Sequence, residues 1–142
     1  MKSLLSALVG TSVLTAFSYL VSGRGKKNFR EPELLGLFLK RLRPGVSRGT
    51  AEISGWLLHY TLGCGWGKFY HHLEKGAGKP ESNFPLVFGC GSGLVAIGSW
   101  HAVFVRHPSP PDIDLKAFYL QLFFGHVLFS LAVSVTDRLA RA

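Results

Sequence analysis

More than half of this chain lies in four apolar stretches that carry almost no formal charge. They run over Leu4–Val21, Ile53–Phe69, Phe84–Val105 and Ala117–Thr136, and Lys68 is the one charged residue among them. A helix needs about 20 apolar residues to cross a hydrocarbon core of about 30 Å, and backbone groups inside a bilayer must be satisfied within helices or closed barrels. The pattern predicts an all-α integral membrane protein in which the four stretches form a four-helix bundle.

The size and the motifs of the chain narrow the class of function. The 142 residues leave room for one domain, which we expect to cover residues 1–142. The sequence contains no catalytic or nucleotide-binding motif, so we expect no enzyme activity. Cys64 and Cys90 both fall inside apolar stretches and lack the spacing of a disulfide framework or a zinc site, so we also expect no metal site.

The lysines and arginines that give the chain its net charge of +8 are concentrated in particular loops. With four spans, loops 22–52 and 106–116 share one side of the membrane and carry 10 of the 16 lysines and arginines. Because cytoplasmic loops are enriched in these residues, we expect both loops in the cytoplasm and both termini outside. We expect no nucleic-acid partner, since the basic residues do not gather beside aromatic side chains on a soluble face.

The long first loop contains a predicted amphipathic helix over about residues 33–42. Its apolar residues repeat with helical spacing: Leu34, Leu35, Phe38, Leu39 and Leu42. Glu31 and Glu33 complement the positive end of the helix dipole, and Lys40, Arg41 and Arg43 lie at the negative end. Two roles stay open. The helix covers the cytoplasmic end of the bundle, or its basic residues form an interfacial surface for anionic lipid or a partner subunit.

The second and third stretches share the motif Gly-Cys-Gly-x-Gly, with Gly63 and Gly67 in one copy and Gly89 and Gly93 in the other. Glycines four residues apart let helices approach closely in a membrane. Since a short loop joins the two stretches, we expect the motifs to face each other and to pack. The alternative is that the cysteines of the two motifs meet and bind a soft metal or react with each other.

Two histidines, His59 and His126, lie well inside apolar stretches. Ionisable residues at membrane depth usually mark function, and the second and fourth stretches run in the same direction, which places these two at similar depth. Three alternatives stay open for the pair. The histidines hydrogen-bond to neighbouring helices in a structural role, they ligate a b-type haem between two imidazoles, or they form with Gln121 a site for a quinone, a proton or another small ligand.

Two segments carry a resemblance to known proteins. The run Gly55-Trp56-Leu57-Leu58-His59-Tyr60 and the later Phe118-Tyr119-Leu120-Gln121-Leu122-Phe123-Phe124-Gly125-His126 resemble small, mostly uncharacterised four-helix bacterial inner-membrane proteins of the YagU-like kind. The resemblance implies a bacterial inner membrane and a bundle of four spans. No activity and no site residue come with it.

Two classes of function follow from these features. Small size, glycine interfaces and a basic surface favour a non-enzymatic accessory or structural subunit of a larger membrane complex, in contact with lipids and partner membrane proteins. The alternative is a protein that binds or transports a small ligand or cofactor, such as haem, quinone or protons, through its intramembrane histidines. The first function requires no cofactor, and haem b belongs only to the second.

Overall fold

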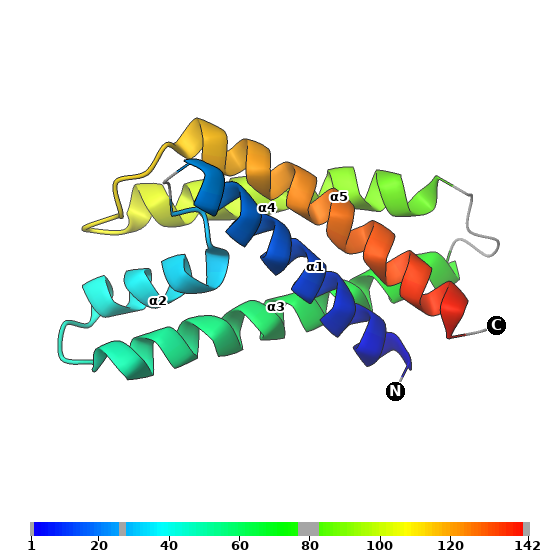
Figure 1. The fold of residues 1–142 in the computed structure, drawn as a ribbon, viewed down its shortest axis with the longest axis horizontal. Coiled ribbons are helices and arrows are strands. Elements are labelled where there is room, and N and C mark those ends of the chain that lie inside the picture. Colours follow the sequence, from blue (N-terminus) through cyan, green and yellow to red (C-terminus); the bar gives the residue numbers. More distant parts are fainter. Residues whose placement is uncertain (1, 26–27, 77–82, 141–142) are drawn as a thin grey trace.

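The computed structural model describes residues 2–25, 28–76 and 83–140, and every regular element in these ranges is an α-helix. The elements in chain order are α1 (Lys2–Gly25), α2 (Glu31–Leu42), α3 (Arg48–Gly76), α4 (Phe84–Arg106) and α5 (Leu115–Leu139). Figure 1 shows the four long helices lying alongside one another, with the short α2 at the end opposite the start of α1 and the end of α5.

Three of the described helices are long and apolar enough to cross a membrane, namely α1 over Ser3–Gly23, α4 and α5. The predicted all-α class is therefore correct, but the four-helix bundle of four spans is wrong, because the described residues form five helices, of which three are candidate spans. The stretch Ile53–Phe69 forms the middle of the 29-residue α3. This stretch has few charged residues, but it contains many glycine, aromatic and polar residues. Helix α3 is therefore less apolar than the other three long helices.

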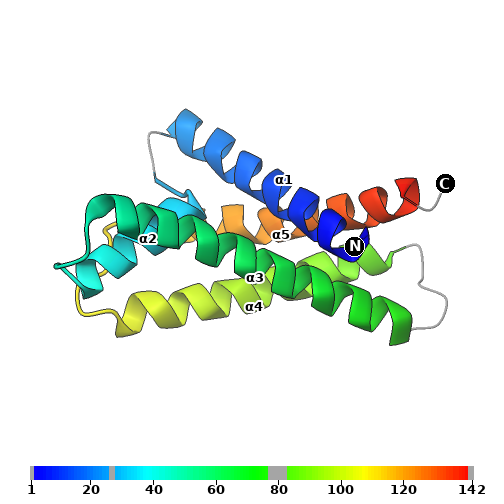
Figure 2. The same cartoon turned by 90° about the horizontal axis from the view of Figure 1, so that it is seen from below.

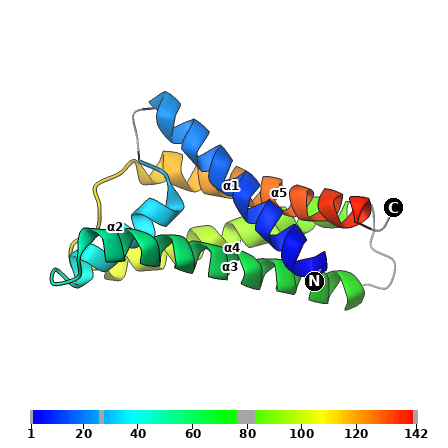
Figure 3. The ribbon, with the colours of Figure 1, turned by 60° about the horizontal axis from the view of Figure 1, so that its bottom comes forward.

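Helix α1 crosses its neighbours α3 and α5 at an angle (Figures 2 and 3). Its buried face is made largely of small and hydroxyl residues, which are Ser6, Ala7, Thr11, Thr15, Ser18 and Ser22. The Thr11 and Thr15 hydroxyls donate to the carbonyls four residues earlier on the same helix, so these hydroxyls are satisfied without a partner helix. Small residues on such a face let helices pack closely. Close packing matters in a bilayer, because lipid tails are as apolar as the side chains and the hydrophobic effect does not drive helices together.

Helix α2 belongs to the core of the molecule. Leu34 is fully buried, and the Phe38 ring meets the Phe104 ring edge-on with centroids 4.9 Å apart. Two contacts bind α2 to the connector between α4 and α5: His107 Nε2 lies 3.1 Å from the Phe38 carbonyl, and Arg41 donates to the Pro110 carbonyl at 2.9 Å. The position of α2 therefore agrees with the alternative in which this helix covers one end of the bundle.

The glycine motifs lie at close helix contacts, but their partners differ from those expected. The nearest residues that a side chain would meet are Thr11 for Gly63, Ala7 for Gly67, Ser130 for Gly89 and Phe123 for Gly93. The expectation that the two motifs face each other was wrong, because α3 packs on α1 and α2 whereas α4 packs on α5. Cys64 and Cys90 are both free thiols.

Candidate functional site

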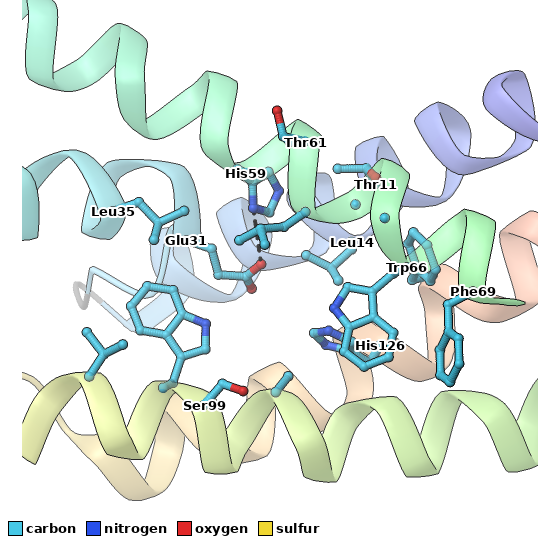
Figure 4. A pocket seen from close by; sticks show the side chains of 17 residues that line it. Thr11, Leu14, Glu31, Leu35, His59, Thr61, Trp66, Phe69, Ser99 and His126 are labelled. Atoms are coloured by element: carbon cyan, nitrogen blue, oxygen red, sulfur yellow. Dashed lines mark ion pairs between the residues drawn. The ribbon is translucent and has the colours of Figure 1, made fainter.

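A cleft of about 560 Å³ opens between α3 and α4, and beside it the Tyr70 ring of α3 packs on the Phe88 ring of α4 with centroids 5.0 Å apart. Every helix contributes to its lining, which includes Thr11, Leu14, Glu31, Leu35, His59, Trp66, Phe69, Ser99, Trp100, Val103, His126 and Phe129. Figure 4 shows Glu31 and His59 meeting at one side of this space, with His126 behind Trp66. The cleft therefore combines an apolar, aromatic wall with three ionisable side chains.

The two ring nitrogens of His59 have different neighbours, which bear on which nitrogen carries the hydrogen. His59 Nε2 lies 2.8 Å from the Thr15 hydroxyl oxygen, and that hydroxyl donates its own hydrogen to the Thr11 carbonyl. With its hydrogen on that carbonyl, the Thr15 oxygen accepts from His59, and in this tautomer the hydrogen is on Nε2 and Nδ1 is an acceptor. Nδ1 lies 3.8 Å from Oε2 of Glu31. His59 thus presents an acceptor to the Glu31 carboxyl.

Glu31 is the first residue of α2 and is 3% exposed. Burial raises the pKa of Glu31 to about 8, against the opposing effect of a hydrogen bond from Gln121 Nε2 to Oε1 at 3.1 Å. The carboxyl is therefore mostly protonated at neutral pH and has one hydrogen to donate. The Gln121 Oε1 atom is buried and accepts no hydrogen bond from any described residue, so this part of the site keeps an open acceptor.

His126 offers an acceptor of its own to the cleft. Its Nδ1 lies 3.0 Å from the Leu122 carbonyl, which can only accept, so the hydrogen is on Nδ1. Nε2 is then the unprotonated nitrogen. The ring lies edge-on to Trp66, with centroids 6.1 Å apart. His126 therefore combines a fixed orientation with a free lone pair.

The structure brings the three predicted ligand-binding residues together, although their role stays a prediction. His59 and His126 line the cleft, and Gln121 is outside the lining but donates to Glu31, which is part of it. Glu31 is the residue that sequence reasoning missed, because its charge was assigned to the helix dipole. A signal was present: Glu31 precedes Leu34, Leu35 and Phe38 by three, four and seven residues, which places it on the apolar face of α2.

The basic residues predicted to bind a partner or lipid lie at the other end of α2. Lys40 donates to the Pro44 carbonyl at 2.7 Å, and Arg41 donates to the connector between α4 and α5. Arg43 is exposed. Two of the three side chains therefore bind the chain's own loops, and the docking role of the group stays a prediction.

Comparisons with models of protein families, with curated proteins and with solved structures find no match to this chain. The resemblance to YagU-like proteins stays a prediction. Any function must therefore be argued from the chemistry of the cleft.

Proposed function

We propose that this chain is a non-enzymatic membrane protein that binds a small, lipid-soluble ring compound of the quinone and quinol class between α3 and α4. The observation that carries the proposal is that Glu31, His59 and His126, from three different helices, line one apolar and aromatic cleft. Ionisable side chains inside a membrane protein are costly to bury and commonly mark a ligand site. A few polar groups in an apolar pocket are also the usual composition of a small-molecule site.

The chemistry of the cleft matches a ring that carries oxygen atoms. The protonated Glu31 carboxyl can donate to a quinone carbonyl, and His126 Nε2 can accept from a quinol hydroxyl. Trp66 and Trp100 line the space from opposite helices and offer flat faces to an aromatic ring. The cleft volume lies within the range of about 300–1,000 Å³ that is typical of small-molecule pockets.

The rim of the cleft supports entry from the bilayer. Leu62 of α3 and Val103 of α4 both line the cleft and are 51% and 42% exposed. An apolar rim between two helices gives a lipid-soluble molecule a path that crosses no polar surface. This arrangement favours a ligand with an apolar tail over a water-soluble one.

A b-type haem is the less favoured ligand of the same site. Axial ligation by His59 through Nε2 would break its hydrogen bond with Thr15, and ligation through Nδ1 would draw the imidazole away from Glu31. A quinone requires neither change. The absorbance spectrum separates the two ligands, because a bound haem gives a Soret band that a quinone lacks.

Tryptophan fluorescence tests the proposed site directly. The purified chain in lipid nanodiscs is titrated with a short-chain quinone, and we expect saturable quenching. Trp66→Phe and Trp100→Phe should remove most of the saturable part. Trp56→Phe is the matched control, because Trp56 lies outside the cleft lining and packs against Tyr19. Quenching that survives both cleft variants would place the quinone elsewhere.

Variants of the polar residues test the head-group contacts. Glu31→Gln and His126→Leu should each weaken quinone or quinol binding by about tenfold, the usual effect of losing one buried hydrogen bond. His101→Leu is the matched control, since His101 is exposed and contacts Tyr119 outside the cleft. Unchanged affinity in Glu31→Gln and His126→Leu, with unchanged helix content, would contradict the proposal.

The accessory-subunit function predicted from the sequence is a second proposal, supported by a different surface. Arg43, Arg48 and Arg106 are exposed at or near the end of the molecule that carries α2, and they could meet an acidic partner. Native mass spectrometry of the protein released from its own membrane distinguishes the two functions. Added polypeptide mass favours the subunit, and a small non-covalent mass favours the ligand.

We also propose that the end carrying α2 faces the cytoplasm of a bacterial inner membrane, which would leave both termini outside. The support is charge, because the basic first loop and the connector between α4 and α5 lie together at this end. A single cysteine at Ser47, in a background of Cys64→Ser and Cys90→Ser, tests the orientation. We expect an impermeant thiol reagent to label it only after the membrane is opened.

A further inference from the structure

A second cluster of ionisable residues lies outside the cleft, at the end of the molecule where α1 begins and α5 ends. His71 and Glu74 are in the last turns of α3, and Asp137 is in the last turn of α5. One ligand atom from each of the three residues lies within 4.8 Å of the other two. The cluster therefore joins side chains from two helices around one point.

The spacing of these atoms suits a metal ion. His71 Nδ1 lies 3.3 Å from Asp137 Oδ2 and 3.7 Å from Glu74 Oε2. Zinc bonds to nitrogen and oxygen are about 2.0–2.2 Å long, which in a tetrahedral site separates neighbouring ligand atoms by about 3.4 Å. Both distances from His71 are close to that separation, and the Glu74 and Asp137 oxygens lie within 4.8 Å of each other, so an ion would bring these two carboxylates into its coordination sphere by side-chain movement.

One tautomer of His71 leaves Nδ1, the nitrogen that faces Asp137 and Glu74, free to bind a metal ion. Its Nε2 lies 3.1 Å from the Ser6 hydroxyl oxygen, and that hydroxyl donates to the Ser3 carbonyl. When the Ser6 hydrogen is on the Ser3 carbonyl, Ser6 accepts from His71 Nε2, and this tautomer leaves a lone pair on Nδ1. A histidine that binds a metal through one nitrogen commonly donates through the other, because that bond fixes the ring.

Asp137 supplies an independent observation. Its side chain is 7% exposed, and Oδ2 makes no hydrogen bond with any residue that the structure describes. Oδ2 lies 3.3 Å from His71 Nδ1, so in the tautomer with the hydrogen on Nε2 two acceptors face each other. A buried carboxylate without compensation is costly, and a cation between the two atoms would satisfy both.

We propose that His71, Glu74 and Asp137 bind a divalent transition-metal ion, with a position left for water. A set of one imidazole and two carboxylates suits ions such as Zn²⁺, Mn²⁺ and Fe²⁺. The sequence predicted no metal site, because it does not show that α5 brings Asp137 beside His71 and Glu74 of α3. Since α3 and α5 otherwise contact each other little, the ion would join two helices and stabilise this end of the molecule.

Zinc binding by the full chain is the test. The protein is purified without a histidine tag, stripped with a chelator and titrated with Zn²⁺ against a chromophoric chelator. We expect about one ion per chain, and Asp137→Asn should weaken binding at least tenfold. His72→Ala is the matched control, because His72 is the exposed neighbour of His71 and is outside the cluster. It should bind Zn²⁺ as the unaltered chain does.

Ser6→Ala and a thermal measurement keep the test decisive if Asp137→Asn misfolds. Removing the Ser6 oxygen should weaken Zn²⁺ binding about tenfold, as is typical for residues that orient a metal ligand. Zn²⁺ should raise the unfolding temperature of the unaltered chain and of His72→Ala, but raise that of Ser6→Ala less. An unaltered chain that binds no Zn²⁺, or equal binding in Ser6→Ala, Glu74→Gln and His71→Ala, would overturn the proposal.

Discussion

The two sides of α3 differ in how close they let another helix come. On one side Gly55, Gly63 and Gly67 lie directly against α2 and α1. On the other side Trp66 and Phe69 line the cleft, and α4 meets α3 through large rings, with the Phe88 centroid 6.1 Å from Trp66 and 6.0 Å from Phe69. Residue size at the facing positions therefore sets the distance between helices, as expected where lipid removes the hydrophobic driving force.

The glycine-rich face of α3, which packs on α1 and α2, also holds in place the polar groups of the cleft. At Gly55 an added Cβ would meet the backbone of Pro32 and of Gly36, so α2 lies against α3 with no side chain between them. This contact holds Glu31 beside His59. The cleft therefore depends on helix packing that lies outside it. Four substitutions, taken from the largest expected effect to the smallest, measure how much individual helix contacts and polar groups contribute.

The largest effect is expected from Gly55→Ala. The new methyl group meets backbone atoms that cannot rotate away, so we expect a loss of about 3 kcal/mol in the free energy of unfolding, the upper part of the range for overpacking. Chemical unfolding of the protein in detergent, followed by circular dichroism, measures it. Gly65→Ala is the matched control, since its added methyl group meets nothing within 4 Å. Equal stability of the two variants would show that the close contact is unimportant.

The second-largest effect concerns Glu31, which should make the free energy of unfolding depend on pH. Burial raises its pKa in the folded protein to about 8 from 4.5, so its stabilising contribution is complete below pH 4.5 and is lost as the pH rises through 8. We expect the free energy of unfolding to fall by an amount on the order of 2 kcal/mol between about pH 6 and about pH 9. Glu31→Gln should remove this dependence.

The same unfolding measurement at several pH values checks the prediction for Glu31. His59 faces the carboxyl and is the matched comparison, because His59→Gln keeps Glu31 in place while removing the neighbouring titratable ring. A pH dependence that persists in Glu31→Gln would assign it to another group.

A smaller effect is expected at the contact between α4 and α5, from Ser130→Ala. The Ser130 hydroxyl donates to the Pro85 carbonyl of α4 at 2.6 Å and lies against Gly89. Losing a hydrogen bond between membrane helices costs about 0.6–2 kcal/mol, so we expect about 1 kcal/mol. Ser99→Ala is the control, because the Ser99 hydroxyl bonds only its own helix among the described residues. An equal effect of both changes would contradict a specific bond between α4 and α5.

The smallest effect is expected from Arg41→Ala, at the exposed end of α2. Arg41 donates to the Ser109 and Pro110 carbonyls, and exposed bonds of this kind contribute about 0.5 kcal/mol. Hydrogen exchange of residues 107–114 should rise while the rest of the chain is unchanged. Arg43→Ala, which changes the exposed neighbouring arginine, should leave this connector unaffected. Equal exchange in the two variants would rule out the bond as the restraint.

Helix periodicity explains which parts of the site could be predicted. His59 and His126 stood out because polar rings are rare in apolar stretches, and the structure places both in one cleft. Glu31 could have been found from its spacing to Leu34 and Phe38, but its position at a helix start supplied a simpler explanation. The cluster of His71, Glu74 and Asp137 could not have been found, because its members lie on two helices that are distant in the chain.

The glycine motifs show the limit of such reasoning. Their spacing indicated close helix contacts, and each of Gly63, Gly67, Gly89 and Gly93 does lie against another helix. Their partners were assigned wrongly, because a short loop between two helices does not require them to pack on each other. Residues on α1 and α5 occupied those faces instead.

The sequence by itself determined the helical class, the apolar character of α1, α4 and α5, and the amphipathic α2, because hydropathy and helical period depend only on local residues. Tertiary structure alone decided that a cleft opens between α3 and α4, that Glu31 meets His59, and that His71 meets Asp137. The physical reason is that a helical pattern specifies which residues share a face. The neighbour of that face depends on how all five helices fit together.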